Sequence, residues 1–337
     1  MTTTKVAMIE WAATALGVPP AQVRQVVLAG DASARQYSRL LTPDGSFIIA
    51  DASAEPDVTA KVVAVAETLQ RAGVRIPTLI ASDQAAGLSL QEDAGDQVLL
   101  SDLTAESVDY WYTKAMPALR ALAGADTEAS NLPQYDRDTL QSELDVCPQW
   151  FLRGLLDLSL DTEFTLAQTR LHEFLIVQAL EQPRVLVHRD FHSRNLMIRD
   201  ADLVVIDFQD ALIGPLCYDW VSLFKDCYCR WPRPRVLQWL RTLHDSLPER
   251  SQAGSDTILV QWFDWIGLQR HLKVLGVFAR LHLRDGKSQY LGDLPRVLAY
   301  IDEVFSLYAD HSEIAPFIAC WRRVVEPALM QQAWYVR

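Results

Sequence analysis

Residues Val185 to Asp210 read VLVHRDFHSRNLMIRDADLVVIDFQD, and they place two acids and an amide at a spacing that suits chemistry on phosphate. The apolar run before His188 predicts a strand, and two further β-type runs, 196–198 and 203–206, flank a turn at 200–202. Asp190 lies before Asn195, and Asp207 follows the second run. If the two runs pair as a hairpin, the three polar side chains are expected to meet at one edge.

These residue types indicate magnesium-assisted phosphoryl transfer. An aspartate can orient an attacking hydroxyl and accept its proton late in the reaction, which makes Asp190 the candidate base. Mg²⁺ prefers oxygen ligands, and Asn195 and Asp207 can supply an amide and a carboxylate oxygen. Each residue alone would more simply be a turn cap, a left-handed turn residue or a strand end. The three together at this spacing favour a catalytic interpretation.

The chain resembles the aminoglycoside phosphotransferase and choline kinase-like family, whose members commonly carry an HxDxxxxN loop and a downstream aspartate. Within that family it is most similar to the anomeric kinases of cell-wall recycling, which phosphorylate C1 of N-acetylmuramate and N-acetylglucosamine. The resemblance rests on blocks in both halves of the chain: GDASARQYSRL (30–40), HRDFHSRNLM (188–197), VIDFQDALIGPLCYDWVSLFKDCYCRWP (205–232) and WFDWIGLQRHLKVLGVFARL (262–281).

The resemblance implies an α/β (α+β) fold with two protein-kinase-like lobes. Residues 1–95 would form a small five-stranded antiparallel nucleotide-binding lobe, and residues 96–337 a mostly helical catalytic and sugar-acceptor lobe. It also implies ATP and Mg²⁺ as cofactors and an anomeric sugar phosphate as product, which a downstream nucleotidyltransferase would use as a pathway partner. In the catalytic loop, His188, Arg189 and Asp219 would serve as structural support.

The predicted nucleotide lobe has a phosphate-covering turn and a hinge. The turn is the small-residue segment before the strand at 36–41, where Ser33, Ala34 and Arg35 would offer a hydroxyl, close backbone approach and a positive charge. The hinge is the segment 91–95 after the last strand of the sheet, with Gln91 and Asp93 as candidate nucleotide contacts. An ordinary polar linker would have the same composition.

One feature of this lobe departs from the family. The third strand usually presents a lysine to the ATP phosphates, whereas this one ends in Ala50 and Asp51. A carboxylate cannot replace an ammonium group. Either Arg35 or Lys61 supplies the positive charge, or the protein binds nucleotide poorly.

The acceptor site is predicted from the catalytic loop and one later helix. His192 and Arg194 lie beside the base, and Arg194 could bind a substrate carboxylate such as the lactyl group of N-acetylmuramate. In the helical segment 262–284, Trp265, Arg270 and His271 are candidates to line the sugar. Aromatic residues at helical spacing are more often core than pocket, so a structural role stays open for each.

Composition favours a folded cytoplasmic enzyme. Half of the 337 residues are hydrophobic, 22% are charged, and the net charge is −12. This charge disfavours nucleic acid and anionic membranes as partners, although it could attract a cationic substrate such as an aminoglycoside. The five cysteines contain no CxxC pair, which indicates reduced thiols. No apolar run reaches the ~20 residues of a membrane span.

Two other functions remain open from the sequence. The protein could be a kinase of another small-molecule hydroxyl, such as an aminoglycoside or choline. It could also be a non-catalytic nucleotide-binding protein, as Asp51 in place of the lysine suggests.

Overall fold

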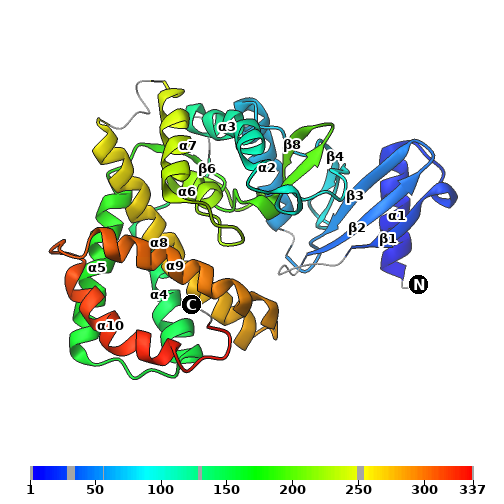
Figure 1. Ribbon diagram of the computed structural model, residues 1–337. Coiled ribbons are helices and arrows are strands. Elements are labelled where there is room, and N and C mark those ends of the chain that lie inside the picture. The colour runs from blue at the N-terminus through cyan, green and yellow to red at the C-terminus, as the bar shows by residue number, and fades with distance from the viewer. Residues whose placement is uncertain (1–2, 29–34, 56, 128–130, 249–253, 336–337) are drawn as a thin grey trace. The chain divides into compact units, whose positions relative to one another are not determined.

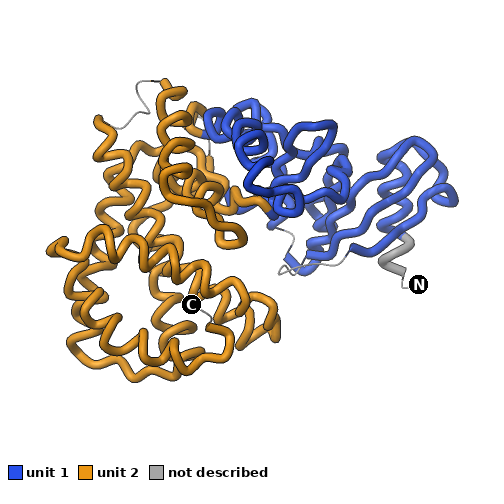
Figure 2. The backbone as a smooth tube through the Cα atoms, viewed as in Figure 1, with its two compact units in different colours: residues 1–122, 194–211 blue, residues 123–193, 212–337 orange. Residues whose placement is uncertain are grey.

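The computed structural model describes residues 3–28, 35–55, 57–127, 131–248 and 254–335. The chain forms two compact units: unit 1 comprises 1–122 and 194–211, and unit 2 comprises 123–193 and 212–337 (Figure 2). Asp190 therefore belongs to unit 2, whereas Asn195 and Asp207 belong to unit 1. The predicted lobe boundary near residue 95 stays a prediction. The two units are defined by how their residues pack, whereas the predicted lobes are defined by their roles in nucleotide binding and catalysis.

Unit 1 is built on a five-stranded antiparallel sheet, as the sequence predicts (Figure 1). Its strands lie in the order β1-β2-β3-β5-β4. Their bounds are β1 (Arg24–Val27), β2 (Gln36–Thr42), β3 (Gly45–Asp51), β4 (Leu79–Asp83) and β5 (Leu88–Glu92). Helix α1 (Thr3–Leu16) covers one face, where Met8 and Ala12 pack against Leu40, Ile49 and Leu90.

The opposite face of the sheet carries the polar side chains. Because side chains alternate along a strand, Tyr37 and Arg39 point away from the face of Leu40. They pair in register with Ala50 and Ile48 of β3. Helix α2 (Asp57–Ala72) buries an apolar stripe at helical spacing and is followed by Gly73 in the left-handed conformation (φ 84°).

The predicted catalytic hairpin is present in unit 1. Strands β7 (Leu196–Arg199) and β8 (Asp202–Val205) pair with Arg199 opposite Asp202. The two residues between them have positive φ, 53° at Asp200 and 57° at Ala201, as a type I′ turn requires. Met197 and Val204 pack with Ala94 in a small apolar cluster.

Helix α3 (Val108–Gly124) completes unit 1. Helical periodicity in the sequence predicts a helix over about 101–123, and the predicted start is wrong. Residues 99–102 form a short 3₁₀ turn instead, and Thr104 and Ser107 exchange side-chain to backbone hydrogen bonds before α3 begins. This reciprocal pair forms a capping box, and the Val108 N–H bonds to the Thr104 carbonyl, so the helical bonds begin at Thr104.

Unit 2 is mostly helical, as predicted. Its long central helix α8 packs against α4, α5, α6 and α9 (Figure 1). The helices are α4 (Arg137–Val146), α5 (Thr162–Leu180), α6 (Tyr218–Phe224), α7 (Arg233–Asp245), α8 (Asp256–Leu283), α9 (Leu294–Leu307) and α10 (Ala315–Leu329). Strands β6 (Arg184–Val187) and β9 (Leu212–Pro215) pair antiparallel and lead into the segments that carry the polar site. Within the described residues, no helix is long and apolar enough to cross a membrane.

Helical periodicity in the sequence also predicts one helix over about 136–158, and the structure corrects this. Helix α4 ends at Val146, and a π-helix, η3 (Cys147–Leu155), continues the chain. Pro148 lacks the N–H that an α-helical bond needs, which permits the change of winding. Gly276 of α8 lies against this junction, since a Cβ there would come within 2.4 Å of the Val146 carbonyl.

Candidate active site

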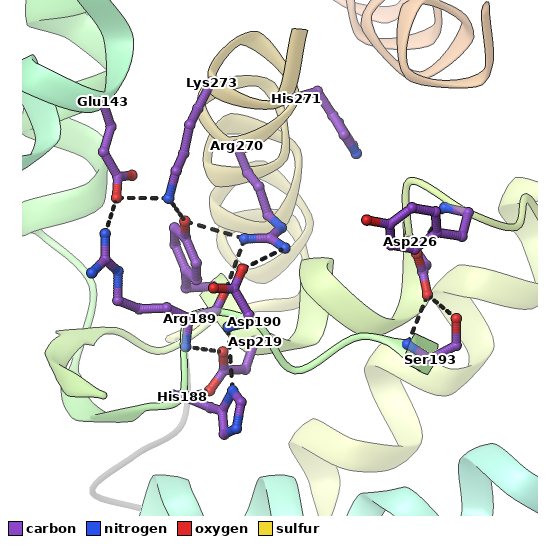
Figure 3. Close-up of polar contacts among 12 residues, drawn as sticks. Glu143, His188, Arg189, Asp190, Ser193, Asp219, Asp226, Arg270, His271 and Lys273 are labelled. Atoms are coloured by element: carbon purple, nitrogen blue, oxygen red, sulfur yellow. Dashed lines mark hydrogen bonds and ion pairs between the residues drawn. The ribbon is translucent and has the colours of Figure 1, made fainter. Parts of the chain in front are cut away.

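The backbone of the loop after β6 is held by Asp219, at the start of α6. The Asp219 carboxylate accepts hydrogen bonds from the N–H groups of His188 (2.6 Å) and Arg189 (3.0 Å) (Figure 3). Burial raises the pKa of Asp219 to about 7, although the two N–H donors and Arg270 favour its charged form. These two hydrogen bonds are the contacts expected of a residue that supports the catalytic loop.

Arg189 adopts an unusual backbone conformation within this loop. Its φ is 76°, in the left-handed region that non-glycine residues seldom occupy. Such a conformation costs on the order of 1–3 kcal/mol and persists where surrounding contacts determine it. The Arg189 guanidinium meets Glu143 of α4 at 2.5 Å, and its carbonyl accepts a hydrogen bond from Arg270 of α8 at 2.8 Å.

Asp190, the predicted base, presents a partly open carboxylate whose side chain is 45% exposed. Arg270 Nη2 lies 3.6 Å from its Oδ1 (Figure 3). Burial disfavours the charged form, but Arg270 and Lys273 hold the pKa of Asp190 well below its usual range. Asp190 is therefore ionised at neutral pH, as a residue that accepts a proton must be.

The far end of the same loop is held by Asp226, a residue that the sequence analysis missed. Asp226 is buried, and its Oδ2 accepts from the N–H (2.9 Å) and the hydroxyl (2.5 Å) of Ser193. Its Oδ1 accepts from the N–H of Tyr228 at 2.8 Å. Two acids after β9, Asp219 and Asp226, thus fix both ends of the segment 188–193.

Glu143 was also missed, although it is the most heavily bonded acid near the loop. Its carboxylate accepts hydrogen bonds from the Tyr135 hydroxyl, Gln269, Arg189 and Lys273. Burial opposes its ionisation, but the charges of Lys273 and Arg189 lower the pKa of Glu143 to about 2. In the sequence it is one acid on a helix, and its partners Arg189 and Lys273 are distant in the chain.

Unit 1 holds the two predicted metal ligands at one end of the β7–β8 hairpin. Leu196 pairs with Val205, and the Asn195 carbonyl accepts from the Ile206 N–H at 3.0 Å. Asn195 and Asp207 therefore lie at the open end of the same hairpin. Asp207 has a left-handed backbone (φ 62°) and a side chain that is 43% exposed.

Their donor set suits Mg²⁺. One amide oxygen and one carboxylate are few protein ligands, but Mg²⁺ usually takes its remaining oxygens from water and substrate phosphates. Within the described ranges, no group of three or more His, Cys, Asp and Glu side chains could hold a metal ion.

Arg35 is the cation that lies beside Asp207. Its guanidinium is 3.3 Å from Asp207 Oδ1 and donates to Gln209 Oε1 at 2.9 Å. The other residues predicted for the phosphate turn, Ser33 and Ala34, lie outside the described residues. Lys61, the alternative cation, is exposed on α2.

The predicted hinge residues have partners within unit 1. Asp93 is buried and forms an ion pair with Arg39, 2.6 Å from Oδ2 to Nε, and its carbonyl accepts from Arg199. Gln91 pairs in register with Ile48 on the face that Arg39 occupies. These contacts give Asp93 a bracing role at the end of β5.

Two of the three predicted sugar-lining residues on α8 lie in the core, whereas the third, Arg270, lies beside Asp190. Trp265 is 2% exposed and packs against Phe174 and Tyr308, while His271 is 1% exposed and stacks on Tyr300 at 4.7 Å. Neither ring has an open face for a sugar, so their prediction as substrate contacts is not supported. The reason is that α8 is enclosed by neighbouring helices, which makes an aromatic stripe part of the core.

Arg270 turns toward Asp190 instead of toward an open surface. His192 is half-buried, with its ring 5.3 Å from that of Tyr228. Arg194 is half-buried in unit 1. Of the predicted acceptor residues, His192 and Arg194 remain the candidates with partly open side chains.

Comparison with known sequences gives consistent matches. Residues 24–251 match the model of a phosphotransferase enzyme family. A protein of Pseudomonas aeruginosa named N-acetylmuramate/N-acetylglucosamine kinase is 38% identical over 90% of this chain and 89% of its own length. A protein of the same name from Neisseria meningitidis is 35% identical over 86% of this chain and 87% of its own.

Solved structures are similar in fold at low sequence identity. The choline kinase LicA from Streptococcus pneumoniae superposes with a TM-score of 0.63 at 12% identity, over 90% of this chain and 100% of that one. The ADP-bound aminoglycoside phosphotransferase APH(2'')-Ib gives 0.58 at 14% identity, over 90% and 99%. The predicted kinase-like fold class is confirmed.

Proposed function

Because the chain belongs to the phosphotransferase enzyme family, we propose that it transfers the γ-phosphate of ATP to the C1 hydroxyl of N-acetylmuramate or N-acetylglucosamine. The Asp190 carboxylate, held ionised beside Arg270 in a loop fixed at both ends, is the observation that carries the chemistry. The names of the relatives from Pseudomonas and Neisseria support the acceptor class.

In the proposed reaction Asp190 orients the C1 hydroxyl and accepts its proton as the oxygen bonds to the γ-phosphorus, while the bond from that phosphorus to the bridging oxygen breaks and ADP leaves. Asn195 and Asp207 would hold Mg²⁺, which would supply positive charge to the phosphate oxygens. His192 and Arg194 are the proposed acceptor contacts. A guanidinium at Arg194 suits a carboxylate, which N-acetylmuramate carries and N-acetylglucosamine lacks.

The product and the setting follow from this chemistry. An anomeric sugar phosphate is a substrate for a nucleotidyltransferase, so we place that class of enzyme after this one in peptidoglycan recycling. An ATP-dependent reaction and five cysteines that form no disulfide among the described residues fit the cytoplasm.

The proposal is tested by measuring ADP release with ATP and Mg²⁺ against N-acetylmuramate, N-acetylglucosamine, choline and kanamycin. We expect turnover with the two amino sugars and an anomeric phosphate signal in the ³¹P NMR spectrum of the product. If only choline or kanamycin were turned over, the amino-sugar acceptor would be wrong, and the proposed phosphate transfer from ATP would stand. Tight ATP binding with no turnover of any acceptor would contradict the proposal.

Arg35 is proposed to take the place of the missing strand lysine, because it is beside Asp207 whereas Lys61 is exposed on α2. Replacing Arg35 by alanine is expected to raise KM for ATP by roughly 10-fold or more, since a charge-assisted contact to phosphate contributes about 1.5–3 kcal/mol. Steady-state kinetics over a range of ATP concentrations measure this.

Lys61→Ala is the matched control and should leave KM for ATP within about fivefold, as an exposed charge contributes about 0–1 kcal/mol. A larger increase for Lys61→Ala than for Arg35→Ala would assign the phosphate contact to Lys61 instead.

A further inference from the structure

A buried charge cluster in unit 2 connects the catalytic loop to three helices. We define it by Glu143 of α4, Arg189 of the loop, and Arg270 and Lys273 of α8, which Figure 3 labels, together with Tyr218 of α6. Every member meets another at hydrogen-bond distance, from 2.5 Å for Arg189 to Glu143 up to 3.2 Å for Arg270 to Tyr218. The cluster thus ties residues from distant parts of the chain to one loop.

Glu143 is the anion of this charge cluster. Its side chain is 7% exposed, and a carboxylate in such a place is costly unless donors surround it. Lys273 Nζ lies 2.7 Å from its Oε1, and Arg189 approaches the same oxygen. The side chain of Arg189 is thereby fixed, although its backbone is in the strained left-handed region.

Arg270 is the member that acts on the base itself. Its Nη1 donates to the Arg189 carbonyl at 2.8 Å and to the Tyr218 hydroxyl at 3.2 Å, and its Nη2 faces Asp190 at 3.6 Å. One planar guanidinium therefore fixes both the main chain before Asp190 and the carboxylate of Asp190. A lysine could not hold both in the same way, because its ammonium group is a single point of charge.

The charged and titratable groups that act on Asp190 come from several elements. Burial raises the pKa of Asp190, and the cations Arg270 and Lys273 of α8 lower it most, with smaller contributions from the loop residues His192 and His188. Asp219 of α6 also faces Asp190, and repulsion between the two carboxylates, when both are charged, adds to burial in raising the pKa of Asp219. Among the charged groups, Arg270 contributes most to keeping Asp190 ionised.

We propose that Glu143 and Arg270 are positioning residues for catalysis, which hold the Arg189 to Asp190 segment rigid and present the Asp190 carboxylate in its charged form. The proposal rests on the phosphotransfer function proposed above, in which Asp190 is the base. A role in stability alone would lower the free energy of unfolding of the variants but leave kcat of the folded variants unchanged.

The first measurement is a titration of the Asp190 carboxyl by ¹³C NMR in the full-length protein without substrates, with the signal assigned by its loss in Asp190→Asn. In the unmodified protein we expect the Asp190 pKa to lie well below the usual carboxylate range. In Arg270→Met it should rise toward or into that range, because the nearest positive charge is removed from the carboxylate. The same titration point in both proteins would overturn the proposal.

The second measurement is the dependence of kcat and KM on pH. Arg270→Met and Glu143→Gln are each expected to lower kcat by about 10–100-fold at neutral pH, because small displacements of a catalytic group have effects of that size. KM for ATP should stay within about twofold. Arg270→Met should also bring an acid limb into the profile, whereas Glu143→Gln should not, since it retains Arg270.

Two further variants separate positioning from folding. Arg270→Lys keeps the positive charge, so we expect a low Asp190 pKa but a reduced kcat; this variant replaces Arg270→Met if the latter does not fold. Arg280→Met, on the same helix α8, is the matched control and should preserve both kcat and the titration. Unchanged kcat in both Arg270→Lys and Glu143→Gln would overturn the proposal.

The two proposals fail in different ways. A protein that turns over no acceptor, but whose Asp190 titration shifts in Arg270→Met, would contradict the proposed function and support the charge effect of Arg270. An active enzyme with identical Asp190 titrations would contradict the positioning role alone.

Discussion

Asp190→Asn is expected to lower kcat by about 10²–10⁴-fold, the range that a positioned general base contributes. Asparagine keeps the size of the side chain but cannot accept the proton of the sugar hydroxyl. KM for ATP should stay within about twofold, because the proposed metal ligands Asn195 and Asp207 are unchanged. Initial-rate kinetics of ADP release with N-acetylmuramate as acceptor measure both parameters.

The fold should survive this substitution. Arg270 retains its hydrogen bonds to the Arg189 carbonyl and the Tyr218 hydroxyl, so removal of the Asp190 charge does not leave Arg270 unpaired. Asp200→Asn is the matched control, because Asp200 is exposed at the tip of the hairpin and asparagine tolerates its left-handed backbone. A kcat for Asp190→Asn within threefold of the control would remove Asp190 as the base.

Gly276→Ala is expected to destabilise the protein by at least about 3 kcal/mol, at the upper end for an overpacked site. The added Cβ would lie 2.4 Å from the Val146 carbonyl and 2.6 Å from the Cys147 nitrogen. Backbone atoms cannot turn aside as a side chain can, so α8 and the α4 to η3 junction must separate. Urea unfolding should show a lower midpoint at an unchanged slope.

Gly267→Ala, on the same helix, is the matched control. Its Cβ would meet Val221 only at 3.8 Å, an ordinary contact, and alanine is favoured over glycine within a helix by about 1 kcal/mol. We therefore expect Gly267→Ala to be neutral or stabilising. Equal midpoints for Gly276→Ala and the unmodified protein would show that the two helices can move apart without cost.

The catalytic hairpin could be predicted from sequence because its information is local. The β7 and β8 runs are short and apolar, and Asp200 and Ala201 fit between them as a two-residue turn. The spacing from Asp190 to Asn195 and on to Asp207 then follows from the chain itself. The five-stranded sheet could be predicted from the sequence in the same way, since glycine and proline mark turns between its strands.

The charge cluster could not be predicted because its partners are distant in the chain. Glu143 contacts Arg189 across 46 positions and Lys273 across 130. On its helix it has the same sequence pattern as a solvated acid. Asp226 similarly reaches Ser193 across 33 positions, and no nearby residue indicates that its carboxylate is buried.

Trp265 and the end of α4 show a second reason why periodicity in the sequence does not predict every feature of the structure. The helical spacing of the aromatic residues on α8 is the same whether the helix faces a pocket or is enclosed, and here it is enclosed. The change from α4 to η3 coincides with Pro148, but it also accommodates the close approach of Gly276, which lies far along the chain. Periodicity along one segment carries no information on such neighbours.

The internal pairing of Arg189 with Glu143 has a consequence for regulation. The counter-charge that orders the loop belongs to the same unit of the same chain, and it is ionised throughout the physiological pH range because Lys273 and Arg189 keep its pKa low. Ordering of the loop therefore requires neither a phosphate group nor a partner protein as a source of negative charge. We expect the freshly folded protein to be fully competent, with flux set by the supply of ATP and acceptor.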